Sequence, residues 1–447
     1  MYSSKITTVS YADGNIQRVQ TVCFKDWKDL DFLLPEYDER SFAGVVSLYR
    51  DFFMPRLSMI EGRVVLYRIP DDLKIPEVFF HQEGEIFYDR TAAVTAMFHK
   101  HVSFRNRKLS FSDKDVESIY DRLKLAGCLY ELDGKRSTIR FLPVGDTMGY
   151  LSGNQTDAGT KVNASFFLFD RLDCPSVYDR IGIPFGLCVK DGKILYPPLY
   201  DREVLTVNRN GEVRVSHISL KDIPVCIDGT VYQDGMNCRF YTRPHRQITP
   251  AGVCDIVIEG RHVVGIRPGG KTVIPAGGFV IQCGEMVRNI ADTEIGYRGL
   301  EDLLFAIQAG NSVMINGKKT DRFLSPFYHF LRPWEISYPP AMYPLNYRKD
   351  RAPRIVLGAD KNNRPVLVWL EGAGKFGHVK GGGSCGASLA ETADICAELG
   401  LYNAVHLDGG GSAQILLDNH RQLKISDRDP EDYSEKERAI AMGLYLK

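Results

Sequence analysis

Short runs of apolar residues separated by glycine and Asn-Gly or Asp-Gly turns dominate the chain after residue 154, a pattern typical of β-strands. They predict strands at 204–207, 213–215, 254–258, 263–266 and 279–282. The pair Asn210-Gly211 predicts a tight hairpin between the first two strands. Two segments have helical spacing instead. One is 298–309, ended by Gly310, and the other is 388–399, which begins with a capping box of Ser388 and Glu391.

The first 145 residues mix helical and strand-like patterns. A capping box at residues 112–115 begins a helix that continues to 126, and a further helix is predicted at 91–101. Asp133-Gly134 then predicts a hairpin between 128–132 and 137–142. Helix followed by hairpin resembles a winged helix, and a basic cluster at 99–108 would suit that interpretation.

These elements predict an α+β fold with two domains. We expect a mixed, largely antiparallel sheet core with flanking helices over residues 146–447, and a smaller accessory α+β domain over residues 1–145. A length of 447 residues with 44% hydrophobic content is ample for such buried cores.

Composition excludes several classes of function. The chain has 56 basic and 56 acidic residues, and residues 1–140 have 21 of each, so no basic field is present to attract nucleic acid. We therefore favour a solvated loop or a subunit contact for the basic cluster at 99–108. No segment approaches the roughly 18 uninterrupted apolar residues of a membrane span, and the N-terminus lacks an apolar signal region, so a soluble, cytoplasmic protein is expected.

The ten cysteines include no CxxC pair, which argues against zinc ribbons and thioredoxin-like chemistry. Reduced thiols are the favoured interpretation, and no metal or cofactor is expected.

The most informative motif is a glycine-rich turn between two apolar runs. Asp408 precedes Gly409, Gly410 and Gly411, and Ser412 follows them. Successive glycines allow positive φ and close approach of the backbone to a ligand, and their amides can converge on an anionic oxygen. A glycine-rich hairpin capped by an aspartate is the alternative without function.

Four further elements occur in a set order around this motif. They are Asn163-Ala164-Ser165-Phe166-Phe167, Pro184-Phe185-Gly186-Leu187, Ala352-Pro353-Arg354 and Glu437-Arg438-Ala439. Together with DGGGS they resemble the phosphodiester glycosidases, over about residues 154–447. The chain departs from the family pattern at Ile355, where threonine is usual, and at Ala164-Ser165, where a second glycine is usual.

The resemblance implies a hydrolase of carbohydrate metabolism that cleaves a sugar 1-phosphodiester to a free sugar and a phosphomonoester. Arg354 and Arg438 are the expected phosphate ligands, because a guanidinium fork binds two phosphate oxygens and stays charged. Asp408 is expected to stabilise the oxocarbenium-like centre or to act as nucleophile or base. Asn163 would position a sugar hydroxyl, with Phe166 and the 409–412 turn as further substrate contacts.

Three other residues are weaker candidates. His406 lies one alternation from Asp408 on the same strand face, where it could assist proton transfer or be structural. Glu371 is a second carboxylate at the end of an apolar run. A second glycine segment, 381–387, precedes the helix at 388, and its Gly383 and Ser384 could bind an anion or form a flexible connector.

Two alternatives to an enzyme remain at this point. The chain could be a sensor that binds a glycosylated phosphate or nucleotide-linked sugar without turnover. It could also be a nucleic-acid-binding protein with a degenerate hydrolase domain, against which the balanced charge weighs. The sugar, the esterified alcohol, the stereochemical outcome and a homo-oligomeric state are left open.

Overall fold

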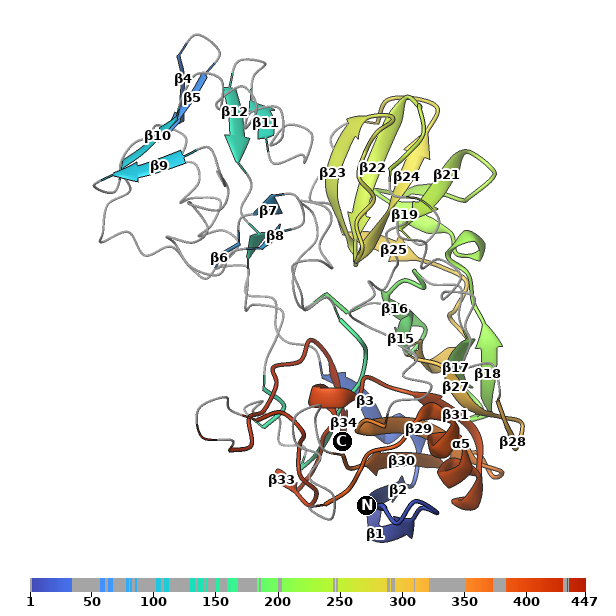
Figure 1. Ribbon diagram of the computed structural model, residues 1–447. Helices are drawn as coiled ribbons and strands as arrows, with labels where there is room; N and C mark the ends of the chain where they lie inside the picture. Colours follow the sequence, from blue (N-terminus) through green and yellow to red (C-terminus); the bar gives the residue numbers. More distant parts are fainter. Residues whose placement is uncertain are drawn as a thin grey trace.

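The computed structural model describes residues 2–33, 150–152, 159–167, most of 183–320, 351–372 and most of 383–447. Between residues 57 and 143 it describes only the backbone of the short strands β4–β13. Sheets dominate all of these parts (Figure 1).

The seven-stranded sheet has the order β1-β2-β30-β29-β31-β27-β28. Its strands are β1 (Tyr2–Ser10), β2 (Ile16–Phe24), β27 (Ser312–Ile315), β28 (Lys318–Lys319), β29 (Arg354–Asp360), β30 (Pro365–Leu370) and β31 (Leu401–His406). All neighbouring strands in it are antiparallel. The hairpin of β1 and β2 therefore belongs to the same sheet as strands more than three hundred residues later in the chain.

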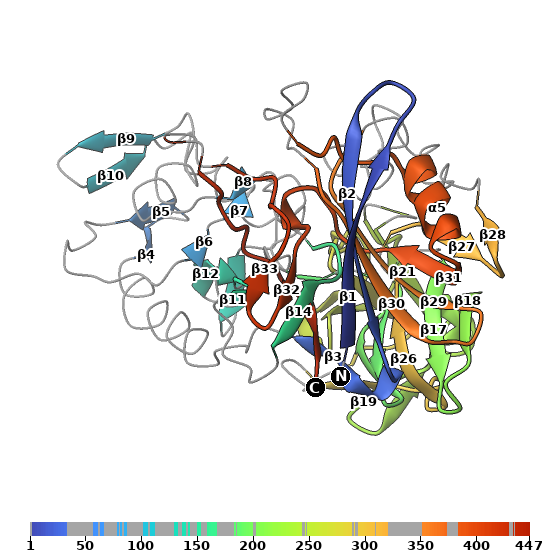
Figure 2. The same cartoon turned by 90° about the horizontal axis from the view of Figure 1, so that it is seen from below.

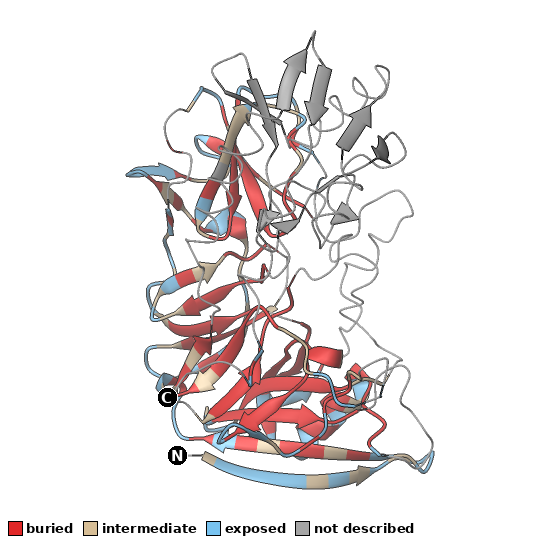
Figure 3. Ribbon diagram, turned by 90° about the vertical axis from the view of Figure 1, so that its left-hand side faces the viewer, coloured by how far each residue is buried: buried red, intermediate tan, exposed pale blue. Residues whose placement is uncertain are grey.

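Both faces of this sheet are buried, which explains the continuous apolar runs in its central strands. Ile355, Leu357 and Trp369 face the main core. Val356 and Val368, on the opposite face, pack with helix α5 (Leu389–Glu398), which lies beside the sheet in Figure 2. β1 forms one edge of the sheet and is mostly exposed, whereas β2 is largely buried (Figure 3).

A five-stranded sheet lies next to it, with the order β3-β34-β14-β32-β33. Its strands are β3 (Leu30–Leu33), β14 (Thr160–Asn163), β32 (Ile415–Leu417), β33 (His420–Arg421) and β34 (Gly443–Leu446). Phe32 of β3 stacks on Phe305 with ring centroids 5.0 Å apart, and Phe305 belongs to a third sheet. These aromatic contacts join the sheets into one core.

The remaining sheets contain the strands between residues 188 and 307. A second five-stranded sheet, β16-β15-β26-β17-β18, contains β15 (Cys188–Lys190), β16 (Lys193–Tyr196), β17 (Glu203–Asn208), β18 (Val213–His217) and β26 (Leu303–Ile307). Sheet β20-β19-β25 contains β19 (Val225–Ile227), β20 (Thr230–Tyr232) and β25 (Ile295–Tyr297). Sheet β21-β24-β22-β23 contains β21 (Cys238–Thr242), β22 (Cys254–Glu259), β23 (His262–Pro268) and β24 (Gly278–Cys283).

The predicted strands and hairpins after residue 200 are confirmed, as are the hairpin at 129–139 and the capped helix α5. The predicted α+β class with flanking helices is wrong, because α5 is the one α-helix in the described residues and antiparallel sheets form the rest. The helix expected at 298–309 is instead β26, in the middle of its sheet between β15 and β17. A short apolar run buried on both sides is compatible with either structure, and here strand pairing determines which one forms.

The boundary predicted at residue 145 does not separate residues 2–33 from the C-terminal part, because β1, β2 and β3 pair within its sheets. The helices predicted at 91–101 and 112–126 lie outside the described residues. In the described part of the chain, no helix has the length and apolarity needed to cross a membrane. The cysteines at described positions are free thiols.

Candidate functional site

The DGGGS motif lies where the seven-stranded sheet meets the five-stranded sheet that contains β14, β32 and β34. Asp408 follows β31, and its backbone N–H donates to the carbonyl of Ala164, 2.8 Å away, just after β14. The turn continues as a single 3-10 turn at Gly410–Ser412 and enters β32. The predicted strand, turn and strand are thus confirmed, and the turn joins the two sheets.

Asn163 fixes the position of this turn. Its side-chain Nδ2 donates to the carbonyl of Asp408 at 2.7 Å, and its Oδ1 accepts from the backbone N–H of Gln414 at 2.9 Å. The side chain is 1% exposed. Both ends of the amide are therefore bonded to main-chain groups on either side of the glycines, which makes Asn163 a positioning residue for Asp408.

The Asp408 carboxyl group is buried at this junction, and burial raises its pKa to about 7. A hydrogen bond from the Ser412 hydroxyl, the charge of Arg438 and the N–H of Gly409 lower the pKa, and the charge of Asp427 raises it. A carboxyl group that titrates near neutral pH can serve as a proton acceptor, a nucleophile or a charge stabiliser.

Glycine suits each of the three positions, at Gly409 and Gly411 because a side chain would be crowded and at Gly410 because of its backbone conformation. A Cβ on Gly409 would lie 2.8 Å from the carbonyl oxygen of Pro353, and Gly410 has a φ of +60°. A Cβ on Gly411 would overlap the side chains of Asp427 and Arg438. The charged pair therefore packs directly on the turn.

Most backbone N–H groups of the turn donate hydrogen bonds to acceptors within the protein. The N–H of Gly410 donates to the Pro353 carbonyl at 3.0 Å, and that of Ser412 donates to the Gly409 carbonyl at 3.2 Å. Because these amides and that of Gly409 already have partners, the nearby guanidinium is the stronger candidate for holding an anion.

Arg438 supplies that guanidinium. Its Nε and Nη2 each lie 2.8 Å from Oδ2 of Asp427, and its side chain is 34% exposed. This ion pair uses the Nε and Nη2 side of the guanidinium and so fixes its orientation. A substantial part of the side chain remains accessible to solvent. Of the two predicted phosphate ligands, the structure places this one against the Asp408 turn.

Arg354 has a different environment. It begins β29 and is 2% exposed, and its Nε donates to the carbonyl of Ala387 at 2.9 Å. Its neighbours Pro353 and Ile355 bond to the backbone at Gly410 and Leu407. The arginine thus connects the strand beside the Asp408 turn to the segment that precedes α5.

His406 is wedged under the turn and is 1% exposed. Its ring centroid lies 5.9 Å from that of Phe166. A Cβ on Gly409 would lie 3.2 Å from its Nε2, and a Cβ on Gly310 would lie 2.7 Å from its Nδ1. The imidazole and Phe166 therefore form packed walls below Asp408.

Glu371 and Ser384 form a separate cluster. Arg18 of β2 pairs with the Glu371 carboxylate, which also accepts from the Ser384 hydroxyl and from the backbone N–H of Lys424. The Ser384 oxygen in turn accepts from the Arg18 N–H at 2.9 Å. This cluster ties the N-terminal hairpin to the second glycine segment, and the contacts of Glu371 and Ser384 described here do not include Asp408. Gly383 beside it is exposed with a φ of +145°, and residues 381–382 lie outside the described part.

Sequence reasoning missed two charged residues near the site. Asp427 holds Arg438, but it lies in a polar loop with no distinctive spacing. Lys161 lies on β14 two residues before Asn163 and is 2% exposed, and burial lowers its pKa. Alternation along a strand places Lys161 and Asn163 on one face. The sequence feature that could have identified Lys161 is a lysine two residues before Asn163 in the same short strand.

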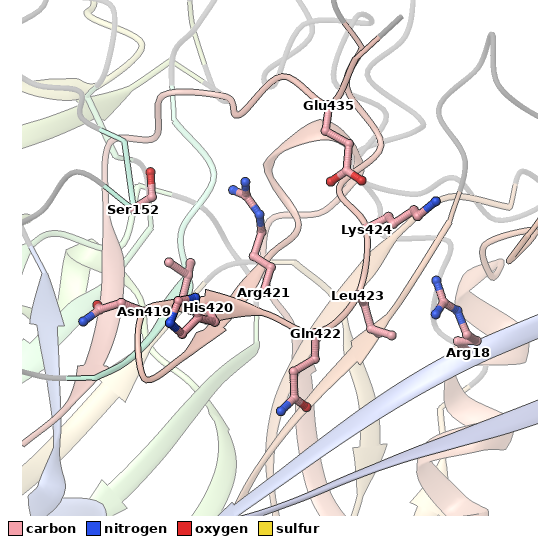
Figure 4. A pocket seen from close by; sticks show the side chains of 10 residues that line it. Arg18, Ser152, Asn419, His420, Arg421, Gln422, Leu423, Lys424 and Glu435 are labelled. Carbon is pink, nitrogen blue, oxygen red and sulfur yellow. The ribbon is translucent and has the colours of Figure 1, made fainter.

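A polar pocket lies over the outer edge of the five-stranded sheet (Figure 4). The charged residues that line it are Arg18, Arg421, Lys424 and Glu435, and His420 lies among them. In the described part of the chain, no group of three or more His, Cys, Asp or Glu side chains has the arrangement of a metal site.

Residues 252–447 match the family model of phosphodiester glycosidase. This region includes the DGGGS turn, Arg354, Asp427 and Arg438. No curated protein matches the chain.

Two solved structures are similar at low identity. A hypothetical protein from Synechocystis is 15% identical with a TM-score of 0.42, and the match covers all of this chain and 62% of that one. The catalytic domain of zebrafish N-acetylglucosamine-1-phosphodiester alpha-N-acetylglucosaminidase, auto-inhibited by its pro-peptide, is 10% identical with a TM-score of 0.40. That match covers all of this chain and 82% of that domain.

Proposed function

We propose that this protein hydrolyses a glycosyl phosphodiester, starting from the match of residues 252–447 to the phosphodiester glycosidases. Water adds to the anomeric carbon, the bond from that carbon to the phosphate oxygen breaks, and a free sugar and a phosphomonoester leave. The observation that carries the proposal is the buried Asp408 carboxyl group, with its raised pKa, on a turn against which Arg438 packs.

The leaving group in this reaction is a phosphate, which is a weak base. It needs neutralisation of charge more than it needs a strong general acid. Arg438 supports that role, because its fork binds phosphate oxygens and stays charged at every relevant pH. Asp427 holds the guanidinium in place through two bonds to one oxygen.

Asp408 in its ionised form would stabilise positive charge at the anomeric carbon, or attack that carbon as a nucleophile. Asn163 fixes the main chain of Asp408, and Ser412 orients the carboxylate by hydrogen bonding. Each of these contacts exists before substrate binds, so the site does not have to reorganise during the reaction.

The test is turnover of an N-acetylglucosamine 1-phosphodiester, measured as release of free N-acetylglucosamine and of the phosphomonoester. Asp408→Asn should lower kcat by roughly a hundredfold or more, the scale of losing a key transition-state interaction. Asp394→Asn is the matched control, because Asp394 is an exposed carboxylate on α5. Near-normal kcat in a folded Asp408→Asn variant contradicts the assignment. Tight binding of the substrate without turnover by the unmodified chain would favour the sensor alternative.

A further inference from the structure

The polar pocket has a volume of about 410 Å³, within the usual range for small-molecule sites. Its walls come from β2, the turn at 151–152, the segment 416–424 and Glu435. In Figure 4 these side chains surround a common space, and the Arg421 guanidinium extends into it between Ser152 and Glu435.

The pocket lies on the same face of the five-stranded sheet as the Asn163 amide. Leu416 lines the pocket and is paired with Lys161 in the β14–β32 ladder. Directly opposed residues of an antiparallel pair point to the same face, and so do residues two apart on one strand. Lys161, Asn163 and Leu416 therefore share a face, and all three are buried. Packed side chains on this face link the pocket wall to the residue that positions Asp408.

Arg421 forms a second connection between the pocket and the Asp408 turn. Its Nη1 donates to Oε1 of Gln414 and to Oε2 of Glu437, both at 3.1 Å. The Gln414 backbone bonds to Asn163, and Glu437 directly precedes Arg438. One arginine in the pocket wall is thus linked to both sides of the candidate catalytic cluster.

The lining determines what chemistry the pocket can accept. Arg18 and Arg421 are already paired with Glu371 and Glu437. Within the described part of the chain, the Lys424 and Glu435 side chains have no hydrogen-bond or ion-pair partner, so a donor and an acceptor remain for a ligand. The apolar lining residues are Leu416 and Leu423, and the described lining includes no Phe, Tyr or Trp. This lining suits hydroxyl groups and does not suit a lipid chain.

We propose that this pocket binds the alcohol esterified to the phosphate on the side away from the cleaved bond, and that this alcohol carries several hydroxyl groups. This inference rests on the proposed function. With the phosphate held at Arg438, the second ester substituent extends toward Arg421, which pairs with Glu437 directly beside Arg438. Glu435 accepts from its hydroxyl groups, and Lys424 donates to them.

The test compares two esters of N-acetylglucosamine 1-phosphate, the methyl ester and the glyceryl ester. In a Lys424→Met variant we expect KM for the glyceryl ester to rise about tenfold, the scale of one lost charged hydrogen bond. KM for the methyl ester and both kcat values should stay unchanged, because Lys424 has no contact with the reacting centre. Glu435→Gln should shift KM in the same selective way.

Lys318→Met is the control, since Lys318 is an exposed lysine on β28. Equal KM changes for the two esters, or no change for either, would overturn the pocket proposal while the wild-type chain still turns both over. If the wild-type chain turns over neither ester, the proposed function fails and this inference fails with it. Thermal unfolding of each variant verifies that the fold is intact.

Discussion

Arg438 and Asp427 form an ion pair in which Nε and Nη2 of the arginine both lie 2.8 Å from the same carboxylate oxygen, directly over the α-carbon of Gly411. The pair comes from a loop after β33, yet it packs on a turn that begins after β31. The charge proposed to bind phosphate is therefore positioned by contact with the glycine motif itself.

Replacing Gly411 by alanine should disrupt this contact. The new Cβ would overlap both charged side chains, so the pair must move away from the turn. We expect kcat/KM to fall at least tenfold, while the free energy of unfolding changes by only about 1–3 kcal/mol, the usual scale for overpacking. Gly284→Ala is the control, because a Cβ there meets nothing within 4 Å. Unchanged kinetics in Gly411→Ala would show that the position of Arg438 does not matter for turnover.

Asp427 should act through Arg438 and not by touching substrate. In Asp427→Asn the guanidinium loses its charged partner, so we expect KM to rise about tenfold and the inhibition constant of inorganic phosphate to rise with it. Loss of a neighbouring negative charge should also lower the pKa of Asp408, which shifts the acidic limb of the pH profile to lower pH. Weaker phosphate inhibition with an unshifted pH profile would show that Asp427 positions Arg438 without affecting Asp408. Unchanged phosphate inhibition together with an unchanged pH profile would exclude the positioning role.

Arg438→Lys tests the geometry of the guanidinium against its charge. Lysine keeps the positive charge but lacks the planar fork, so it should fail to restore activity. Steady-state kinetics of Arg438→Lys and Arg438→Ala measure the difference. Similar losses in both support bidentate binding, whereas near-complete activity in the lysine variant would show that charge alone suffices. The same pair of substitutions at Arg354 tests whether that buried arginine contributes beyond its bond to Ala387.

If the proposed role of Asp408 is correct, its titration should determine how activity depends on pH. Because its pKa is raised to about 7 and the proposed roles need the ionised form, kcat/KM should increase as the pH rises through about 7. A kcat/KM profile between pH 5 and 9 measures this. Activity that instead falls above pH 7 would assign the protonated carboxyl as a general acid.

The same raised pKa has a consequence for stability. The folded protein keeps a proton on Asp408 between about pH 4 and pH 7, where the unfolded chain has released it, so this contribution to stability is lost as the pH rises through that range. Asp408→Asn should therefore be at least as stable as the parent at pH 8, and the advantage should shrink toward pH 4. Denaturant unfolding at both pH values provides the comparison. A variant much less stable than the parent at pH 8 would contradict the raised pKa.

The N-terminal hairpin should be essential for folding. Removing residues 1–24 deletes β2, whose Val19 and Val22 are fully buried against β30. We expect insoluble or unfolded protein, whereas removal of β1 alone, which is the exposed edge, should leave a soluble fold. Circular dichroism and thermal unfolding of the two truncations decide this. A well-folded chain without β2 would show that its pairing adds little.

Local sequence signals predicted the turn, its flanking strands and the capped helix because each depends on neighbouring residues. Gly410, Asn210-Gly211 and Ser388 favour their turn or cap geometry through local backbone preferences and hydrogen bonds. The strand at 303–307 and the fold class were mispredicted, because they depend on pairing with distant strands that periodicity cannot reveal. The contacts of Asn163 with the Asp408 and Gln414 main chains are likewise non-local, so the sequence indicated an important residue and assigned it a different role.

The placement of β3 beside β34 affects how the chain can assemble during synthesis. Leu30 pairs with Leu446, so the first strand of the five-stranded sheet leaves the ribosome long before its neighbour exists. The same delay applies to β2, which waits for β30. Until then these early strands expose hydrogen-bonding edges that can pair wrongly, and non-local pairing of this kind is slow. The yield of folded protein should accordingly depend strongly on translation rate and on the supply of chaperones.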